Sequence, residues 1–286
     1  MAFPLYNKQE LLESPSQEDG LDAAVQKRLR NSYCDLIQGA GAELKLPQYV
    51  VACAIFLCHH FFAVKSMRRN DRFLVATACL YLGSKMEDRP KNVKDVITAC
   101  FVKRFGSDSE RVRRLKDAEH MQAVREMVFD AEKVVLLETG FNFIVDLPYH
   151  HALTFLDSLP LDRVSDEQKL KLTQTVWDLI NDSLRTTLLL EYSPAAIAAG
   201  MVGLAVTVSK EMCDTGAIWE DVKEGHTVEK DIRKQMLDLY DLSSGRARGS
   251  EVSRDHSQNY MDHSQNYAEQ SQSQTRPSWN DDLDRS

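Results

Sequence analysis

Residues 73–83 read Phe-Leu-Val-Ala-Thr-Ala-Cys-Leu-Tyr-Leu-Gly and contain no charged side chain. A second stretch, residues 195–206, reads Ala-Ala-Ile-Ala-Ala-Gly-Met-Val-Gly-Leu-Ala-Val and has the same character. A helix that is apolar all round has no polar face to turn to water, so other helices must enclose it. Both stretches lead into Ser-Lys, and they lie about 125 residues apart. This spacing predicts two central helices in a tandem repeat of one helical unit.

Helical patterns continue on both sides of the two central stretches. Prolines that open helices and glycines that end them lie between the apolar segments, for example Pro90, Gly140, Pro148 and Pro194. No segment shows sustained period-two alternation, so we predict an all-α protein without a sheet. We expect helices over residues 22–40, 48–63, 70–86, 91–103, 121–139, 148–158, 167–190, 194–211 and 227–242.

The composition is that of an ordinary globular protein, with 43% hydrophobic and 27% charged residues. The formal net charge of −8 argues against a general nucleic-acid binder that relies on a basic surface. The six cysteines form no C-x-x-C pair, which favours reduced core thiols over a disulfide framework or a metal site. We expect no signal peptide at the N-terminus and no membrane span, because the longest apolar stretch, residues 49–64, is too short.

The C-terminal segment differs from the rest of the chain. Residues 244–286 are rich in serine and glutamine, and His-Ser-Gln-Asn-Tyr occurs twice, at 256–260 and 263–267. Such a segment buries too little apolar surface to offset the entropy lost on ordering. We therefore predict a disordered polar tail.

Five stretches, in order along the chain, carry a resemblance to a known family. They are residues 14–21 with 29–34, residues 44–48 with the Cys-His-His-Phe-Phe at 58–62, residues 78–91, residues 132–143, and residues 177–187. Together they resemble a transcription-type cyclin, and within that group cyclin T, particularly its plant form, with cyclins K and L as near relatives. The resemblance covers residues 10–243.

The resemblance implies two tandem cyclin-box bundles of about five helices each. An N-terminal extension would occupy residues 1–20, the first cyclin box 21–145, the second 146–243 and the tail 244–286. It implies a nuclear regulatory subunit, not an enzyme, that binds and activates a cyclin-dependent Ser/Thr kinase acting on the RNA polymerase II C-terminal repeats. The polymerase tail and elongation factors are further expected partners. No catalytic residue, cofactor, metal, membrane or direct nucleic-acid contact is expected.

Two other functions stay open on the sequence. A cyclin L or K role in splicing-coupled transcription would use the same kinase interface, so only the partner's identity distinguishes it. A general transcription factor that binds DNA through tandem cyclin boxes would carry a zinc ribbon and a basic second repeat. The chain has neither feature.

The resemblance also assigns the kinase-binding residues. Lys85 and Glu132 would be the central contacts, because an ammonium can donate to backbone carbonyls of a kinase helix and a carboxylate can accept from its N–H groups. Without the family, both would be read as solvated helix charges. The surrounding residues are Met86, Glu87 and Asp88 at the rim, with Leu136, Phe141 and Phe143 as apolar contacts. The spacing of the two phenylalanines equally suits one ring in the core and one at the surface.

Two further groups of residues have no function assigned by the resemblance. Arg111, Arg113, Arg114 and Lys116 form a basic cluster that could contact RNA, a phosphorylated loop or a regulator, or could be a solvated face. The pairs His59-His60 and His150-His151 are neighbours on predicted helices, where adjacent side chains point about 100° apart. We expect structural roles for them and no metal site.

Overall fold

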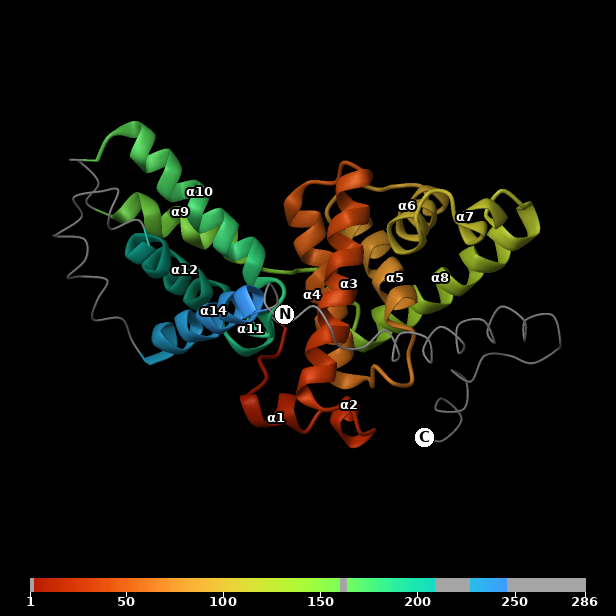
Figure 1. Cartoon of the computed structure of the whole chain (residues 1–286), viewed down its shortest axis with the longest axis horizontal. Helices are drawn as coiled ribbons and strands as arrows, with labels where there is room; N and C mark the ends of the chain where they lie inside the picture. The colour runs from red at the N-terminus through yellow and green to blue at the C-terminus, as the bar shows by residue number, and fades with distance from the viewer. Residues whose placement is uncertain (1–2, 160–163, 209–226, 246–286) are drawn as a thin grey trace. The chain divides into compact units, whose positions relative to one another are not determined.

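The computed structural model describes residues 3–159, 164–208 and 227–245, and every regular element among them is a helix (Figure 1). The prediction of an all-α fold is therefore confirmed for the described part of the chain. One compact unit covers Met1–Leu237. Within the described residues, no helix is both long and apolar enough to cross a membrane.

Five long helices build the first bundle, preceded by two short helices of the N-terminal segment. The short helices are α1 (Lys8–Leu12) and α2 (Pro15–Glu18), and the bundle contains α3 (Ala23–Glu43), α4 (Gln48–Val64), α5 (Arg72–Met86), α6 (Val93–Phe105), the one-turn α7 (Glu110–Arg114) and α8 (Ala118–Glu138). Every residue of α4 from Val50 to Phe62 is buried, and α5 packs between α4 and α8. Gly83 lets α5 approach the backbone of α4 at Ala54. The two most apolar helices of this bundle thus lie at its centre.

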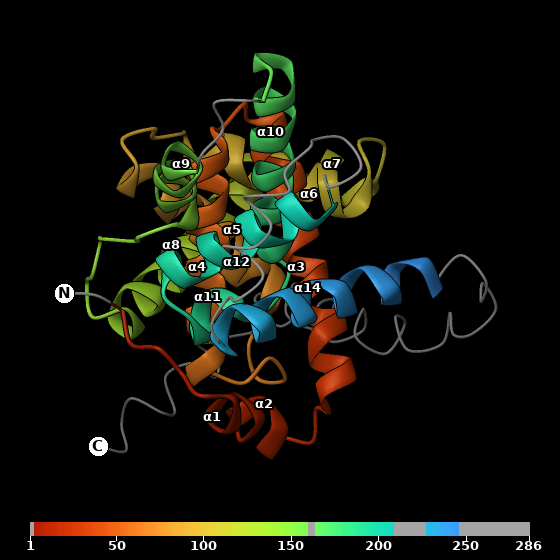
Figure 2. The same cartoon turned by 90° about the vertical axis from the view of Figure 1, so that its left-hand side faces the viewer.

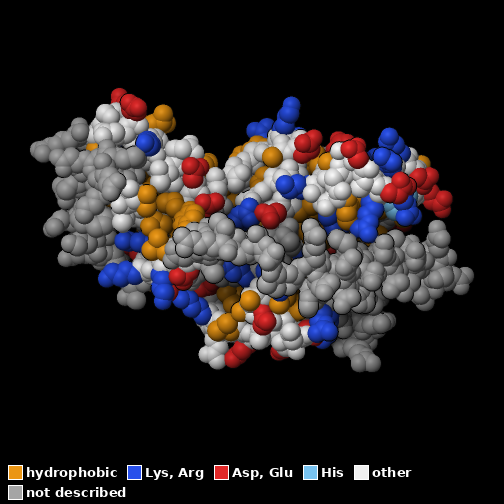
Figure 3. All heavy atoms as spheres, viewed as in Figure 1, with side chains coloured by type: hydrophobic (Ala, Val, Ile, Leu, Met, Phe, Trp, Pro, Cys, Tyr) orange, Lys and Arg blue, Asp and Glu red, His pale blue; other side chains and the backbone are white. Residues whose placement is uncertain are grey.

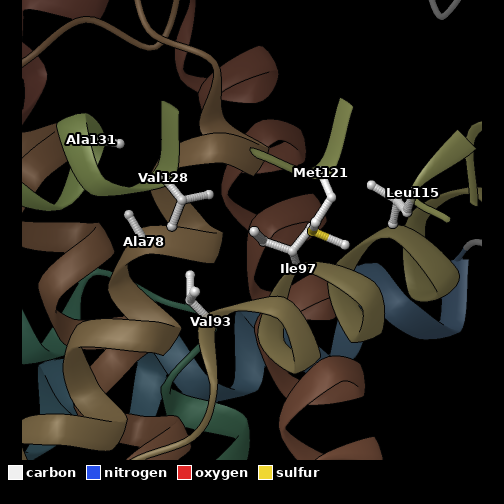
Figure 4. Close-up of a cluster of buried hydrophobic side chains, with 7 residues drawn as sticks. All are labelled: Ala78, Val93, Ile97, Leu115, Met121, Val128 and Ala131. Atoms are coloured by element: carbon white, nitrogen blue, oxygen red, sulfur yellow. The ribbon is translucent and has the colours of Figure 1, made fainter. Parts of the chain in front are cut away.

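Side chains from four consecutive elements form one of the cores of the first bundle (Figure 4). Ala78 of α5 faces Val128 of α8, while Ile97 of α6 lies next to Met121. The cluster consists of Ala78, Val93, Ile97, Leu115, Met121, Val128 and Ala131. This packing fixes α8 against α5, which determines how far apart the ends of these two helices lie.

Side-chain caps set where the helices of the first bundle begin. Asp22 accepts a hydrogen bond from the Val25 N–H, Asp71 from the Phe73 N–H and Asp117 from the His120 N–H, at 2.7 to 2.8 Å. The first N–H groups of a helix have no partner within the helix, so a carboxylate at the N-cap satisfies one of them. These positions explain why α8 begins at Ala118, earlier than the apolar pattern predicts.

The second bundle is built around α12 (Pro194–Val208), the second central helix predicted from the sequence. Its other described helices are α9 (Pro148–Ser158), α10 (Asp166–Ser183), α11 (Leu188–Glu191) and α14 (Thr227–Gly245). α12 packs against α9 and α10, and Ile232 of α14 lies against Gly200. Figure 2, in which this side of the molecule faces the viewer, has α12 between these neighbours.

Two further predicted helices differ from the structure. The helix expected over residues 22–40 continues to Glu43, because Lys103 and Val51 pack over Gly39 and Gly41 and support the helix there. The helix expected over residues 167–190 is interrupted between Ser183 and Leu188. At the interruption the Leu184 carbonyl bonds to His59 of the first bundle at 2.8 Å, in place of a partner in its own helix.

The interruption after α10 and the N-terminal segment both join the second bundle to the first. Arg185 reaches back to α3, with 2.7 Å contacts to Asp35 and Gln38. The Tyr6 N–H donates to the Leu190 carbonyl at 2.8 Å, and Lys8 pairs with Asp231 of α14 at 2.7 Å. The junction is therefore made of specific polar contacts from α3, α4 and the N-terminal segment.

Some sequence predictions fall outside the described residues. These are the tail from residue 246 onward, Cys213 and the Ser-Lys pair at 209–210. α14 extends to Gly245, so the first two residues assigned to the tail are helical. The five described cysteines are all buried and free, as predicted for core thiols.

Candidate partner-binding surface

Lys85 and Glu132 form an ion pair where α5 and α8 lie side by side. They are 47 positions apart in sequence, and the packing of the two helices brings them together. The Glu132 side chain is 9% exposed and that of Lys85 is 39% exposed. The Lys85 ammonium also lies 4.3 Å from the centre of the Tyr81 ring, one turn earlier on α5. The pair is therefore held at a fixed place, with the ammonium at the surface.

The position of Lys85 follows from the character of α5. The helix is buried along most of its length, and Lys85 lies in its last turn. A cation there interacts favourably with the carbonyls at the C-terminal end of the helix. Among the described residues, only Lys85 forms an ion pair with Glu132, and none donates a further hydrogen bond to it. The Glu132 carboxylate can therefore accept hydrogen bonds from a partner.

The chain leaves α5 through a tight turn that places three predicted rim residues next to the pair. The Arg89 N–H donates to the Ser84 carbonyl at 2.8 Å, and the Asp88 N–H donates to the Lys85 carbonyl at 3.3 Å. This is a Schellman motif with Asp88 in the left-handed position, at φ 53°. Met86 and Glu87 are half-buried and Asp88 is exposed. Burial raises the pKa of the Glu87 carboxyl, which lies beside the Cys53 thiol.

An apolar patch follows at the end of α8. Leu137, Phe141, Phe143 and Ile144 have exposed fractions of 56%, 55%, 51% and 69%. The two phenyl rings pack edge to face, with centroids 6.4 Å apart and an interplanar angle of 81°. We call these four residues the apolar patch. Because both rings are exposed, the reading that places one of them in the core is wrong.

A second Schellman turn ends α8 and leads into the phenylalanines of this patch. The Gly140 N–H donates to the Leu137 carbonyl at 3.0 Å, and the Phe141 N–H donates to the Leu136 carbonyl at 2.9 Å. Both Gly140 and Phe141 have positive φ, at 59° and 56°. Glycine adopts this conformation readily, whereas phenylalanine does so at a cost. Leu136 itself is half-buried on α8.

Taken together, these residues form a surface that suits the binding of a protein partner. It offers one ammonium and one buried carboxylate on two packed helices, with the apolar patch at the end of α8 and in the segment that follows it. No group of three or more His, Cys, Asp or Glu side chains that could hold a metal ion occurs among the described residues. This combination suits the binding of a helix from another protein. The backbone groups of that helix would hydrogen-bond to Lys85 and Glu132, and its apolar side chains would pack against the apolar patch.

Three residues of this surface were not predicted from the sequence. Tyr81 supports the Lys85 ammonium, and Leu137 and Ile144 belong to the apolar patch. The i, i+4 spacing of Tyr81 and Lys85 could have indicated the first contact. The exposure of Leu137 and Ile144 has no comparable local signal in the sequence.

Three of the four paired histidines have settings that suit the expected structural roles. His59 is buried and bonds to Tyr33 at 2.5 Å and to the Leu184 carbonyl at 2.8 Å. His60 is buried beside Phe3, with ring centroids 5.0 Å apart. His151 pairs with Asp146 at 2.9 Å.

The comparisons with known proteins agree on one family. A family model described as "Cyclin, N-terminal domain" matches residues 2–143. Cyclin-T1-4 of Arabidopsis thaliana is 34% identical over 247 residues, which cover 85% of this chain and 44% of the relative. Cyclin-T1-3 of Oryza sativa subsp. japonica is 33% identical, over 82% of this chain and 48% of the relative. Human cyclin-L1 is 33% identical, over 75% and 40%. The chain thus spans less than half the length of these relatives.

Solved structures share the fold at low sequence identity. The yeast RNA polymerase II CTD kinase CTDK-1 complex contains a chain that matches with a TM-score of 0.65 and 15% identity, over 84% of this chain and 74% of that one. A chain of the yeast TFIIK complex matches with a TM-score of 0.58 and 17% identity, over 81% and 95%. The family model and the curated relatives lead to the same conclusion: this chain belongs to the cyclin family, among the transcription-type cyclins that include cyclin T.

Proposed function

We propose that this cyclin binds and activates a cyclin-dependent Ser/Thr kinase that phosphorylates the C-terminal repeats of RNA polymerase II. Cyclin family proteins are regulatory subunits, and we assign this chain that role in place of a catalytic one. The yeast complexes whose chains share its fold are described as an RNA polymerase II CTD kinase and as TFIIK. A nuclear location follows from the proposal, because the kinase would work where the polymerase does.

The observation that carries the proposal is the ion pair of Lys85 and Glu132 beside the apolar patch. In a protein kinase, a glutamate on a mobile helix must pair with the lysine that positions the ATP phosphates. A partner that binds this helix only in its inward position shifts the kinase toward the active state. Lys85 and Glu132 would bind the backbone of the kinase helix, and Phe141 and Phe143 would pack against its apolar side chains.

The assigned domain boundaries are part of the proposal. Residues 21–145 would form the first cyclin box, which carries the kinase-binding residues, and 146–243 the second. The segment from Gly140 to Leu147, between α8 and α9, supports a boundary near residue 145. The N-terminal extension, residues 1–20, and the tail from 244 would lie outside the two boxes.

Charge exchange at the ion pair tests the proposal. The chain would be purified with its kinase from its native cells and assayed on polymerase-tail heptad peptides, as wild type, Lys85→Glu, Glu132→Lys and the double exchange. The double exchange can re-form the ion pair and keep the fold, but it presents each charge in the wrong place. We expect all three variants to lose at least about tenfold in kinase recovery and in peptide phosphorylation.

A matched control is Lys133→Ala, on the position next to Glu132 on α8. The Lys133 side chain is 71% exposed and pairs only with Asp130 among the described residues, so this variant should behave as wild type. Full recovery and activation by the double exchange would overturn the assignment of these contacts. If no kinase is recovered with the wild type, the proposed function itself is wrong.

The second candidate is a cyclin L or K type subunit in splicing-coupled transcription. The 33% identity to human cyclin-L1 is the observation that favours it. Both candidates use the same surface, so variants of Lys85 do not separate them. Identifying the co-purified kinase by mass spectrometry does.

A further inference from the structure

The basic region at the other end of the first bundle contains arginines stacked on two phenylalanines. The Arg104 guanidinium lies 4.0 Å from the Phe73 ring centre and 4.7 Å from the Phe105 ring centre. Arg72 lies over Phe73 at 4.2 Å, and Arg111 lies over Phe105 at 4.5 Å. We call these five residues the arginine–phenylalanine cluster. Stacking holds each guanidinium plane in place and reduces the side-chain entropy that binding would cost.

Arg104 and Arg111 have few partners among the described residues around them. Arg104 is only 23% exposed, yet no described residue accepts a hydrogen bond from it, and its one ion pair, with Asp71, is long at 3.9 Å. Asp71 is already engaged, because its Oδ1 caps α5 at the Phe73 N–H. Arg111 has no ion pair and no hydrogen bond with any described residue. Half-buried charged groups are normally paired, so the donors of Arg104 and Arg111 that no described residue uses are suited to an anionic partner.

The electrostatics of Arg104 support this interpretation. Burial, and then the charges of Arg72 and Arg111, lower the pKa of Arg104 to about 10 against the opposing effect of Asp71. The acidic residues Asp108 and Glu110 lie in the adjoining segment and form no ion pair with the cluster. Figure 3 shows Lys and Arg side chains at the end of the molecule that carries α7, with Asp and Glu side chains beside them. An incoming anion would therefore be attracted to the cluster.

We propose that the arginine–phenylalanine cluster binds a phosphorylated serine or threonine in a segment of a protein partner. A guanidinium presents its donors in a planar fork that matches a phosphate, and such hydrogen bonds are strong because both groups are charged. The site is separate from the kinase-binding pair, since Arg72 and Lys85 lie at opposite ends of α5, about 20 Å apart along the helix axis.

The size of the cluster favours a phosphorylated side chain over a nucleic acid. Arg104 and Arg111 both lie over the ring of Phe105, so their two guanidinium groups are neighbours. A nucleic-acid strand requires a row of cations along its backbone, and the chain as a whole carries a net charge of −8. One phosphate dianion, in contrast, matches two or three neighbouring guanidinium groups.

Fluorescence anisotropy with the full chain tests the site. The probes are a fluorescein-labelled degenerate peptide pool centred on phosphothreonine, the same pool centred on threonine, and a single-stranded RNA oligonucleotide of equal charge. We expect the phosphorylated pool to bind at least about tenfold more tightly than either of the others. Arg104→Gln and Arg111→Gln should each weaken this binding about tenfold. Arg111→Lys, which keeps the charge and loses the fork, should weaken it by a smaller factor.

Lys94→Gln is the matched control, because Lys94 is an exposed cation at the start of α6, the helix that carries Arg104 near its end. It should leave binding within about twofold of wild type. Because Arg104 also packs against Phe73 and Phe105, circular dichroism would check that the Arg104→Gln variant is folded. Arg111→Gln provides a second variant. Equal binding of the threonine pool, tighter binding of RNA, or no effect of the Arg111 variants would overturn the proposal.

Discussion

His59 shows how one buried side chain can hold two bundles together. Its Nε2 contacts the Leu184 carbonyl, which can only accept, so the proton of the neutral ring lies on Nε2. Nδ1 is then free to accept the hydrogen bond of the Tyr33 hydroxyl. Burial, reinforced by the charge of Arg30, lowers the pKa of His59 to about 3. The junction therefore depends on this imidazole staying neutral.

This neutrality predicts a loss of stability in mild acid. An unfolded histidine has a pKa of about 6.5, so below that pH the unfolded chain binds a proton that folded His59 does not bind. The free energy of unfolding should fall as the pH falls from about 6.5 toward 3, by about 2 kcal/mol for this residue between pH 7 and pH 5. His60, whose pKa burial also lowers, acts in the same direction.

Urea unfolding at several pH values measures the effect. The variant His59→Phe removes this titration, so its free energy of unfolding should depend less on pH, by about 1 kcal/mol per pH unit between pH 5 and 6. It should also be less stable at pH 7 by about 2 kcal/mol, because the Tyr33 hydroxyl and the Leu184 carbonyl lose their partner. A variant with the pH dependence of wild type would show that His59 is not responsible.

At the scale of the helices, close packing determines where the binding residues lie. Gly83 precedes Lys85 by two positions on α5. A Cβ added to Gly83 would lie 3.3 Å from both the Cβ and the backbone N of Ala54. These atoms belong to the buried helix α4 and have no room to move. Gly39 of α3 differs, because a Cβ there would meet only the end of the Lys103 side chain, which can swing aside.

The two glycines therefore predict opposite outcomes for substitution. Gly83→Val should lower the free energy of unfolding by about 2 to 3 kcal/mol and weaken kinase binding, because α5 must shift away from α4. Gly39→Ala should be neutral or stabilising by up to about 1 kcal/mol, since alanine favours the helix. Chemical denaturation of both variants checks this. Equal destabilisation by the two would contradict the packing argument.

The elements could be predicted from the sequence where the controlling signal is local. The all-round apolar character of residues 73–83 indicated a central helix, and Pro148 and Pro194 marked helix starts that the structure confirms. The break after Ser183 could not be predicted, because its cause, His59, is 125 positions away from Leu184. The end of α3 was missed for the same reason, since the side chains that support Gly39 and Gly41 come from other helices.

The binding surface also contains residues with a local sequence signal and residues without one. Lys85 and Glu132 were assigned through the resemblance, because spacing alone gives no reason to pair residues on helices that meet only after folding. The exposure of Phe141 and Phe143 follows from two consecutive positive φ angles at Gly140 and Phe141. Glycine suggests such a turn, but a phenylalanine in the left-handed region has no sequence signal.

At the scale of the whole molecule, the junction between the bundles decides whether they unfold together. Arg185 bonds to Asp35 and Gln38 at 2.7 Å, and its side chain is 30% exposed. With His59 it connects α3 and α4 to the turn after α10. Contacts of this kind couple two packed units only while both sides are folded, so their loss should reduce cooperativity more than it reduces the stability of either bundle.

Differential scanning calorimetry tests this coupling. We expect a single transition for the wild type, a single transition for Arg185→Ala at a Tm lower by a few degrees, and two resolved transitions when Arg185→Ala is combined with His59→Phe. Arg69→Ala is the control, because Arg69 pairs with Asp19 inside the first half of the chain, away from the contacts of Leu184 and Arg185. If the double variant still unfolds in one transition, the N-terminal contacts of Tyr6 and Lys8 suffice to couple the bundles, and the junction at His59 is not the decisive link.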